Sequence, residues 1–441
     1  MTSSQFTASR PAPATAMPLP SSLWAATAPP APPTPALRES LATDVLVIGG
    51  GFTGLSTALH LAEGGAHVCV LEANEPGWGA SGRNGGQAIV GYANDHAVEA
   101  QLPPADARRA WQLTVEGLQL LRDRISRHAI DCDYRPGYLS LAVNPRKSGA
   151  LAGWTRHVQQ DYGYPLQAIA KADLPQWIAS EHFDSGVYDP NSGHLHPLKY
   201  CLGLAAAARA AGVAIHENSA VTQVQRGARP VVRTAQGEVA CSFVVLAGNV
   251  YLNEFGHAIA PELSQRIMPV GTYIITTEAM SEARAAALIP SRAAVCDTNF
   301  ILDYFRATAD HRLLFGGRVS YSSATPRNLA ATMRQRMLDV FPQLADLAVS
   351  HTWGGFVDIT MNRAPDFGRI DGNLYYLQGF CGHGLALTGM AGKLAAETIA
   401  GQAERFDLLA RIRHRPFPGG ALMRMPALVL GMLYYRLRDM L

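Results

Sequence analysis

A glycine-rich turn near residue 50 has the composition and spacing of a dinucleotide-binding site. The run Asp44–Ile48 is short, apolar and rich in β-branched residues, as in a strand that is buried on both faces. Gly49, Gly51 and Gly54 follow it in the pattern GxGxxG. The first glycine permits a tight turn, the second lets the backbone approach a pyrophosphate, and the third lets helix and strand pack closely.

The residues after the glycines complete this pattern. Phe52 and Thr53 begin a run with apolar residues at helical spacing, and the free N–H groups and dipole of a helix start attract phosphate. A second strand, 67–71, ends on Glu72, with Ala73 beside it. An acid about twenty residues after the glycines is placed to accept hydrogen bonds from a ribose. The order predicts a dinucleotide site without distinguishing NAD from FAD.

The next stretch, Trp78–Gln87, favours FAD. Its glycines and small polar residues suit a backbone wrapped closely around a ligand better than a helix or strand. It resembles the D-amino-acid-oxidase-like superfamily of FAD-dependent amine and amino-acid oxidoreductases, and within it the gamma-glutamylputrescine oxidoreductase group. The resemblance implies that this loop passes the ribityl chain and the flavin ring. The residues it assigns to the cofactor here are Ser81, Gly82, Arg83, Asn84, Gly85, Gly86 and Gln87.

A second glycine turn lies near the C-terminus. Residues 373–384 and the helix expected from Leu385 to Ala400 again read as strand, glycine turn and helix. The resemblance implies that this helix start faces the pyrimidine end of the flavin, where it stabilises negative charge on reduction. It assigns further cofactor contacts to Val224, Gly248, Gly382, His383, Gly384 and Leu385. The resemblance runs from about residue 41 to the end, and the first forty residues lack a clear counterpart.

The fold class predicted from these segments is α/β. Residues 41–95, 193–260 and 355–405 are expected to form a Rossmann-like FAD-binding domain of the glutathione-reductase-like type. Residues 96–192 and 261–354 interrupt the βαβ pattern and are expected to form an inserted α+β substrate domain on a mixed or antiparallel sheet.

Several elements of the substrate domain follow from periodicity. An apolar stripe predicts a long amphipathic helix over 105–128. Strands are expected over 270–277, 300–305 and 313–318.

The two ends of the chain have a different character. Residues 1–40 are rich in Ala, Pro, Ser and Thr and predict a disordered or extended arm, with Trp24 as its expected anchor on the body. Residues 406–441 are expected to be a tail packed on the body.

Composition limits the other function classes. A formal net charge of +2 over 441 residues gives no indication of nucleic-acid binding. Six scattered cysteines without a CxxC pair favour a reduced, cytoplasmic setting, and no window approaches the length of a membrane-spanning helix. His194 and His196 have no carboxylate nearby in sequence, so no metal site is predicted.

The resemblance implies amine oxidation, in which a C–H beside the amine gives a hydride to flavin N5 and the imine is hydrolysed to an aldehyde. Tyr304 and Arg306 share one face of a strand and are the substrate-side candidates, a surface salt bridge being the alternative for Arg306. His383 is a candidate for hydrogen bonding to flavin or amine, unless it only shapes the turn. Arg363 is a candidate for raising the electron affinity of the flavin.

Departures from the related sarcosine oxidases refine this prediction. Residues 353–358 contain no cysteine, which predicts non-covalent FAD. Gly86 or Gln87 stands where those enzymes have an arginine for the substrate carboxylate, and residues 313–315 lack the lysine that assists reaction with O2. The electron acceptor, O2 or another molecule, therefore stays open.

The predicted substrate is a small amine whose carboxylate is distant, gamma-glutamylputrescine or a similar N-acylated diamine. Oxidation of a D-amino acid or N-methyl amino acid is the alternative. An NAD-dependent dehydrogenase and a flavin-binding subunit without turnover are the remaining rivals.

Overall fold

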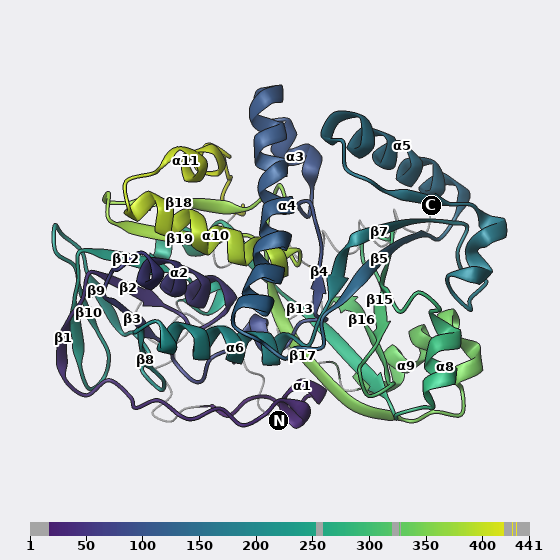
Figure 1. Ribbon diagram of the computed structural model, residues 1–441, viewed down its shortest axis with the longest axis horizontal. Helices are drawn as coiled ribbons and strands as arrows, with labels where there is room; N and C mark the ends of the chain where they lie inside the picture. The colour runs from purple at the N-terminus through teal and green to yellow at the C-terminus, as the bar shows by residue number, and fades with distance from the viewer. Residues whose placement is uncertain are drawn as a thin grey trace.

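Two large sheets organise the chain. The computed structural model describes residues 17–252, 259–319, 326, 328–418, 426 and 429. Figure 1 shows a mainly parallel sheet in the left half and a larger mixed sheet in the right half, with helix α4 (Pro104–Arg127) at the centre of the view. Helix α4 confirms the long amphipathic helix expected over 105–128.

The parallel sheet carries the glycine turns. Its order is β18 (Asp366–Ile370), β19 (Leu374–Gln378), β12 (Phe243–Leu246), β2 (Val45–Ile48), β3 (Val68–Leu71) and β8 (Ala214–His216). All its neighbours pair in parallel except β18, which runs antiparallel to β19. Every residue of β2 is buried, as expected of a strand with covered faces. The α/β fold class is confirmed.

Helices α2 (Phe52–Glu63), α6 (Pro197–Ala210) and α10 (Gly384–Ile399) pack together over this sheet. The approach of α10 to α2 depends on Gly392, because a Cβ there would lie 2.6 Å from the backbone nitrogen of Thr57. Helix α11 (Glu404–Ala410) packs on β18 and α10.

The mixed sheet has nine strands. They are β17 (Val349–Thr360), β13 (Ile267–Thr277), β16 (Leu313–Val319), β15 (Tyr304–Ala307), β14 (Ala294–Asp297), β5 (Arg135–Ala142), β7 (Ser185–His194) and β4 (Gln87–Ala88), with β6 (Gln167–Ile169) beside β7. Strands β13 and β17 pair antiparallel from Ile267 opposite Thr360 to Thr277 opposite Val349. This register brings the end of β17 to the glycine turn after β19.

Phe305, Phe315 and Phe341 join an apolar cluster on one face of this sheet, together with residues of α8 (Glu282–Leu288) and α9 (Leu329–Val340). Further helices are α3 (Asp95–Glu99), α5 (Pro145–Tyr162) and α7 (Pro261–Ser264). Among the described residues, no helix is long and apolar enough to cross a membrane.

A small third sheet flanks the parallel one. It consists of β1 (Ser40–Ala42), β11 (Glu238–Ala240), β10 (Val231–Arg233) and β9 (Gln223–Gln225). Strands β10 and β11 pair antiparallel as a hairpin.

The strand expected over 300–305 is wrong at its start. Strand β15 begins at Tyr304, and residues 298–302 form a turn. The Asp297 carboxylate accepts hydrogen bonds from the backbone nitrogen of Asn299 (2.9 Å) and from its side chain (2.7 Å). Such a local side-chain bond competes with strand pairing. Strand β17, which no expectation covered, contains two adjacent glycines, Gly354 and Gly355, that obscure its pattern.

The arm is ordered over its described part. Residues 17–39 run as extended chain except for α1 (Leu23–Thr27), where Ser22 caps the first turn and Trp24 is 2% exposed. Trp24 therefore anchors the arm, as expected. Residues 1–16 and most of the tail from 419 lie outside the described residues, and the domain boundaries stay a prediction.

Candidate active site

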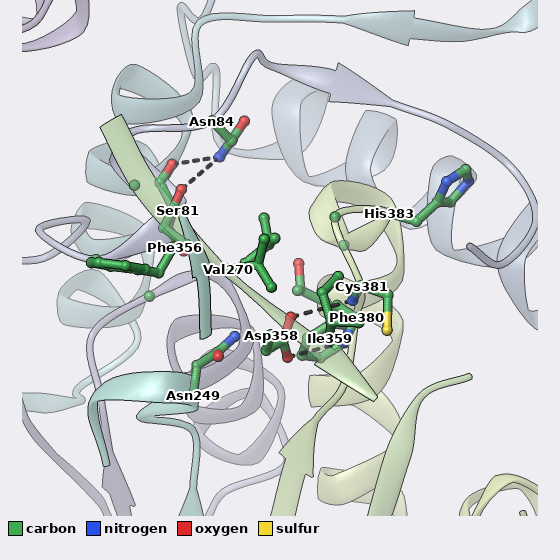
Figure 2. Close-up of a pocket in the computed structure, with 18 of the residues that line it drawn as sticks. Ser81, Asn84, Asn249, Val270, Phe356, Asp358, Ile359, Phe380, Cys381 and His383 are labelled. Carbon is green, nitrogen blue, oxygen red and sulfur yellow. Dashed lines mark hydrogen bonds between the residues drawn. The ribbon is translucent and has the colours of Figure 1, made fainter. Parts of the chain in front are cut away.

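A cavity of about 840 Å³ runs from the glycine turn after β2 to the turn after β19. Figure 2 shows Ser81 and Asn84 on one side of it and Asp358, Phe380 and Cys381 on the other, with Val270 between them. Both large sheets contribute to its walls. The cavity thus connects the segments that the sequence assigned to one cofactor.

The first glycine turn is shaped by close backbone contacts. Gly49 has φ +112°, and a Cβ there would lie 2.7 Å from the carbonyl oxygen of Ala247. A Cβ at Gly54 would lie 1.9 Å from the carbonyl oxygen of Gly49. Gly51 precedes the first turn of α2 without a side-chain cap, so N–H groups of this helix start other than that of Phe52 remain for an anion.

Glu72 lies at the end of β3, where one oxygen accepts a hydrogen bond from the nitrogen of Gly50 (2.6 Å) and the other from that of Asn74 (3.0 Å). Burial raises the pKa of Glu72, and these bonds oppose that shift. With Ala73, it lines the cavity in the position expected for a ribose acceptor.

The loop from 78 to 87 is stabilised by its own side chains. Asn84 donates to the carbonyls of Ala80 and Ser81, both at 3.0 Å, and accepts from the nitrogen of Gly86 at 2.8 Å. The hydroxyl of Ser81 accepts from the nitrogen of Phe52 at 3.0 Å. These bonds connect the loop to the first turn of α2.

Most of the predicted cofactor residues line the cavity. They are Gly49, Gly51, Phe52, Thr53, Glu72, Ala73, Ser81, Arg83, Asn84, Gly85, Gln87, Gly248, Gly382, His383, Gly384 and Leu385. Those outside the lining are Gly54, Gly82, Gly86 and Val224.

The structure explains why three of these residues, Gly82, Gly86 and Val224, do not line the cavity. Gly82 and Gly86 have no room for a Cβ, which would lie 2.2 Å from the Gly77 carbonyl oxygen and 2.0 Å from that of Leu195. Val224 lies in β9 of the small sheet, while Val221, three residues earlier, lines the cavity.

The three predicted catalytic residues are not equivalent. Tyr304 lines the cavity, and its ring lies against Gly85 and Gly316, where a Cβ would come within 2.5 Å and 2.1 Å of ring atoms. Arg306, on the same face of β15, lies outside the lining and is 3% exposed. Its guanidinium donates to the carbonyls of Gly85 (2.8 Å) and Leu195 (2.7 Å), so its placement is that of a support beneath the loop.

His383 lies at the start of α10 and its ring turns to the carbonyl of Val90, with 3.2 Å between Nε2 and the oxygen. Burial lowers the pKa of His383 to about 4, and the nearby Arg363 guanidinium acts in the same direction. The side chain is therefore neutral at physiological pH, with the proton on Nε2.

Asp358 is the residue that sequence reasoning missed. This carboxylate on β17 is 2% exposed and accepts hydrogen bonds from the nitrogens of Gly379 (2.5 Å), Phe380 (3.0 Å) and Cys381 (3.3 Å). Burial raises the pKa of Asp358 to about 6, against the three N–H bonds. The signal was an acid within an apolar strand that ends beside a glycine turn.

The two histidines considered for a metal are used elsewhere. His194 contacts the carbonyl of Arg292 at 2.9 Å through Nε2, and His196 contacts the hydroxyl of Thr27 at 3.0 Å. Within the part of the chain that the structure describes, no three His, Cys, Asp or Glu side chains gather in a metal-binding group.

Comparison with known proteins decides the family. The DAO family, described as FAD dependent oxidoreductase, matches residues 44–398. The chain belongs to this family. It is 44% identical over 422 residues to gamma-glutamylputrescine oxidoreductase of Escherichia coli (strain K12), covering 96% of this chain and 98% of the relative. It is 40% identical to a probable oxidoreductase, OrdL, of Haemophilus influenzae, over 92% of this chain and 94% of the relative.

Solved structures agree on the fold. Glycine oxidase from Bacillus cereus superposes with a TM-score of 0.69 at 22% identity, over 85% of this chain and 99% of that chain. L-proline dehydrogenase from P. horikoshii gives 0.67 at 20% identity, over 84% and 94%. The predicted family, enzyme class and FAD dependence are confirmed. The expected lack of a counterpart for the first forty residues is wrong, since 96% coverage by one relative includes at least half of them.

The residues of this DAO-family chain fit FAD. Gly49 and Gly51 have no side chain that would keep a pyrophosphate from the backbone, and the Glu72 oxygens would be available as acceptors for a ribose. The start of α10 presents its first turn to the other end of the cavity. These features support the predicted cofactor contacts.

Asp358→Asn should weaken FAD binding. The amide keeps one acceptor oxygen and turns an NH2 group toward N–H donors, and each buried polar group left unpaired costs about 1–3 kcal/mol. We expect the Kd for FAD, measured by flavin fluorescence quenching, to rise about tenfold or more. Asp303→Asn is the matched control, because this partly buried acid just before β15 pairs with Arg336 and is outside the cavity lining. Equal Kd values for the two variants would contradict the role of Asp358.

Proposed function

We propose that this enzyme oxidises the primary amine of gamma-glutamylputrescine, or of a similar N-acylated diamine, to an aldehyde. The proposal rests on the 44% identity to gamma-glutamylputrescine oxidoreductase, which extends over 96% of this chain. When bound, FAD accepts a hydride at N5 from the C–H beside the amine, and water hydrolyses the resulting imine.

Apart from the two glycine-rich loops, much of the cavity wall is apolar and aromatic. Tyr92, Tyr138, Phe300 and Tyr304 contribute to the cavity wall. Such a wall disfavours an ammonium and so favours the neutral amine, the form whose lone pair assists hydride loss. We propose that Tyr304 forms part of the wall that orients the reacting C–H, while Arg306 acts through the loop that it supports.

Arg363 supplies a positive charge to the cavity beside Phe300. Among the described residues it has no ion-pair partner, and its Nε is buried without a hydrogen-bond acceptor. Its guanidinium carbon lies 5.0 Å from the centre of the Phe300 ring, and its backbone has φ +59°. Met361, two residues earlier, lines the same cavity and is 49% exposed, which indicates that this end opens to solvent.

This arrangement supports an amine whose other end carries a carboxylate. The amine enters the apolar interior, and the glutamyl carboxylate stays near the opening, within reach of Arg363. A guanidinium binds a carboxylate through two parallel hydrogen bonds. We assign this role to Arg363 in place of tuning the electron affinity of the flavin.

We further propose a glutathione-reductase-like cofactor domain with residues 96–192 and 261–354 as an inserted substrate domain, and non-covalent FAD. The six cysteines are all unpaired and buried, which supports a cytoplasmic setting. The electron acceptor is O2 or another molecule.

An anaerobic titration with gamma-glutamylputrescine tests the function. We expect stoichiometric bleaching of the oxidised-flavin band near roughly 450 nm, because the cofactor takes up both electrons. Readmitting air then shows whether O2 restores the band. Bleaching by sarcosine or a D-amino acid, with none by the acylated diamine, would overturn the proposal in favour of the alternative substrates.

Arg363→Gln should discriminate between substrates with and without a carboxylate. A hydrogen bond to a charged group contributes about 1.5–3 kcal/mol. We therefore expect KM for gamma-glutamylputrescine to rise about tenfold or more, with KM for N-acetylputrescine unchanged. Arg363→Lys, which keeps the charge and loses the fork, should fall between. The same change in KM for both amines would show that Arg363 does not bind the carboxylate.

His383→Asn should leave the pH profile of flavin reduction unchanged between pH 6 and 9. A histidine pKa lowered to about 4 means that the ring is already neutral at pH 6, so no proton leaves it as the pH rises further. The rise of kcat/KM with pH should then follow deprotonation of the substrate amine. If the apparent pKa disappears in the variant, His383 is the titrating group.

A further inference from the structure

The loop from 78 to 87 is called the flavin loop below. Three successive carbonyl groups of this loop accept hydrogen bonds from side chains of three different elements. The hydrogen bonds run from Trp353 Nε1 of β17 to the Arg83 oxygen (2.9 Å), from Trp24 Nε1 of α1 to the Asn84 oxygen (2.9 Å), and from Arg306 Nε of β15 to the Gly85 oxygen (2.8 Å). The loop has little regular structure of its own, so these donors determine how its peptide planes are oriented.

The three donors form one buried cluster. The ring centres of Trp24 and Trp353 are 5.9 Å apart at an interplanar angle of 70°, and the guanidinium carbon of Arg306 lies 5.2 Å from the centre of the Trp24 ring. The exposed fractions of the three side chains are 2%, 4% and 3%. Trp24 is the member supplied by the N-terminal arm, and it contacts both of the others.

Several further contacts hold the arm in this place. A helix of five residues is not stable alone, so α1 depends on its docking. The hydroxyl of Thr27 bonds to Nε2 of His196 (3.0 Å), the nitrogen of Met17 donates to Asn74 (2.9 Å), and the indole of Trp78 donates to the carbonyl of Pro18 (3.1 Å). The arm therefore contacts Asn74, just after Glu72, and Trp78, at the start of the flavin loop.

Fixing the carbonyls also determines where the neighbouring N–H groups point. In a trans peptide the C=O of one residue and the N–H of the next point in opposite directions. The N–H groups of Asn84 and Gly85 thus point away from Trp353 and Trp24, and both residues line the cavity. No acceptor among the described residues takes either N–H, whereas that of Gly86 is bonded to the Asn84 side chain.

We propose that Trp24 is a positioning residue for the flavin. Through the Asn84 carbonyl it presents the N–H of Gly85 to the acceptor atoms of the isoalloxazine ring, while Trp353 does the same for Asn84. The arm lies outside residues 44–398, which the DAO family matches, yet coverage of 96% by gamma-glutamylputrescine oxidoreductase includes at least half of the first forty residues. The arm is thus an addition to the family domain that such relatives share.

Trp24→Phe tests this role, because phenylalanine keeps an aromatic ring in the cluster and lacks the indole N–H. We expect about a tenfold rise in the Kd for FAD, measured by fluorescence quenching of added flavin. We also expect a lower midpoint potential of the bound flavin, since N–H donors favour the electron-rich reduced ring. Trp177→Phe is the matched control, because Trp177 packs on Tyr188 and is outside the cavity lining.

Thr27→Val is a second variant that does not touch the buried cluster. Thr27 is exposed, and valine keeps its shape while losing the bonds of its hydroxyl to His196 and to the carbonyl of Leu23. We expect a smaller shift of the potential in the same direction. A potential equal to the wild-type value in both variants would overturn the proposal, as would a shift in Trp353→Phe that Trp24→Phe lacks. These measurements need no substrate, so a failure of the amine proposal leaves them interpretable.

Discussion

A buried carboxylate holds the turn at which the parallel sheet meets the cofactor cavity. Gly379, Cys381 and Gly382 all have positive φ, at 80°, 54° and 81°. This conformation aims successive N–H groups at one point, and such groups are costly to bury without an acceptor. Asp358 is that acceptor, and it comes from the mixed sheet. The cavity between the sheets thus depends on one acid that links them.

Strand β17 has a second attachment of the same kind. Trp353, five residues before Asp358, donates to the flavin loop on the opposite side of the cavity. The two cofactor loops are irregular, so neither satisfies its own backbone groups by helix or strand bonds. One strand therefore relates both loops to each other, and its full-length pairing with β13 gives it a fixed place.

Charge along the cavity changes from one end to the other. Glu72 lines the cavity near the first glycine turn, whereas Arg363 lines it close in sequence to Met361, which is 49% exposed. Much of the remaining lining is apolar, His383 is neutral, and Arg83 and Asp358 are its other charged residues in the described part of the chain. This distribution supports the substrate that we propose, in which the reacting amine and the carboxylate lie far apart.

The sequence by itself determined the family, the cofactor and the two glycine turns, because each depends on neighbouring residues: glycines at fixed spacing after an apolar strand, followed by a helix. It also placed Tyr304 and Arg306 on one face, since strand alternation is a local rule. Only the tertiary structure decided that Tyr304 reaches the cavity while Arg306 supports the loop, and that Trp24 and Asp358 serve backbone groups far away in the chain. Those roles depend on which long-range acceptor or donor lies within hydrogen-bond distance, and residue type and spacing carry no record of that distance.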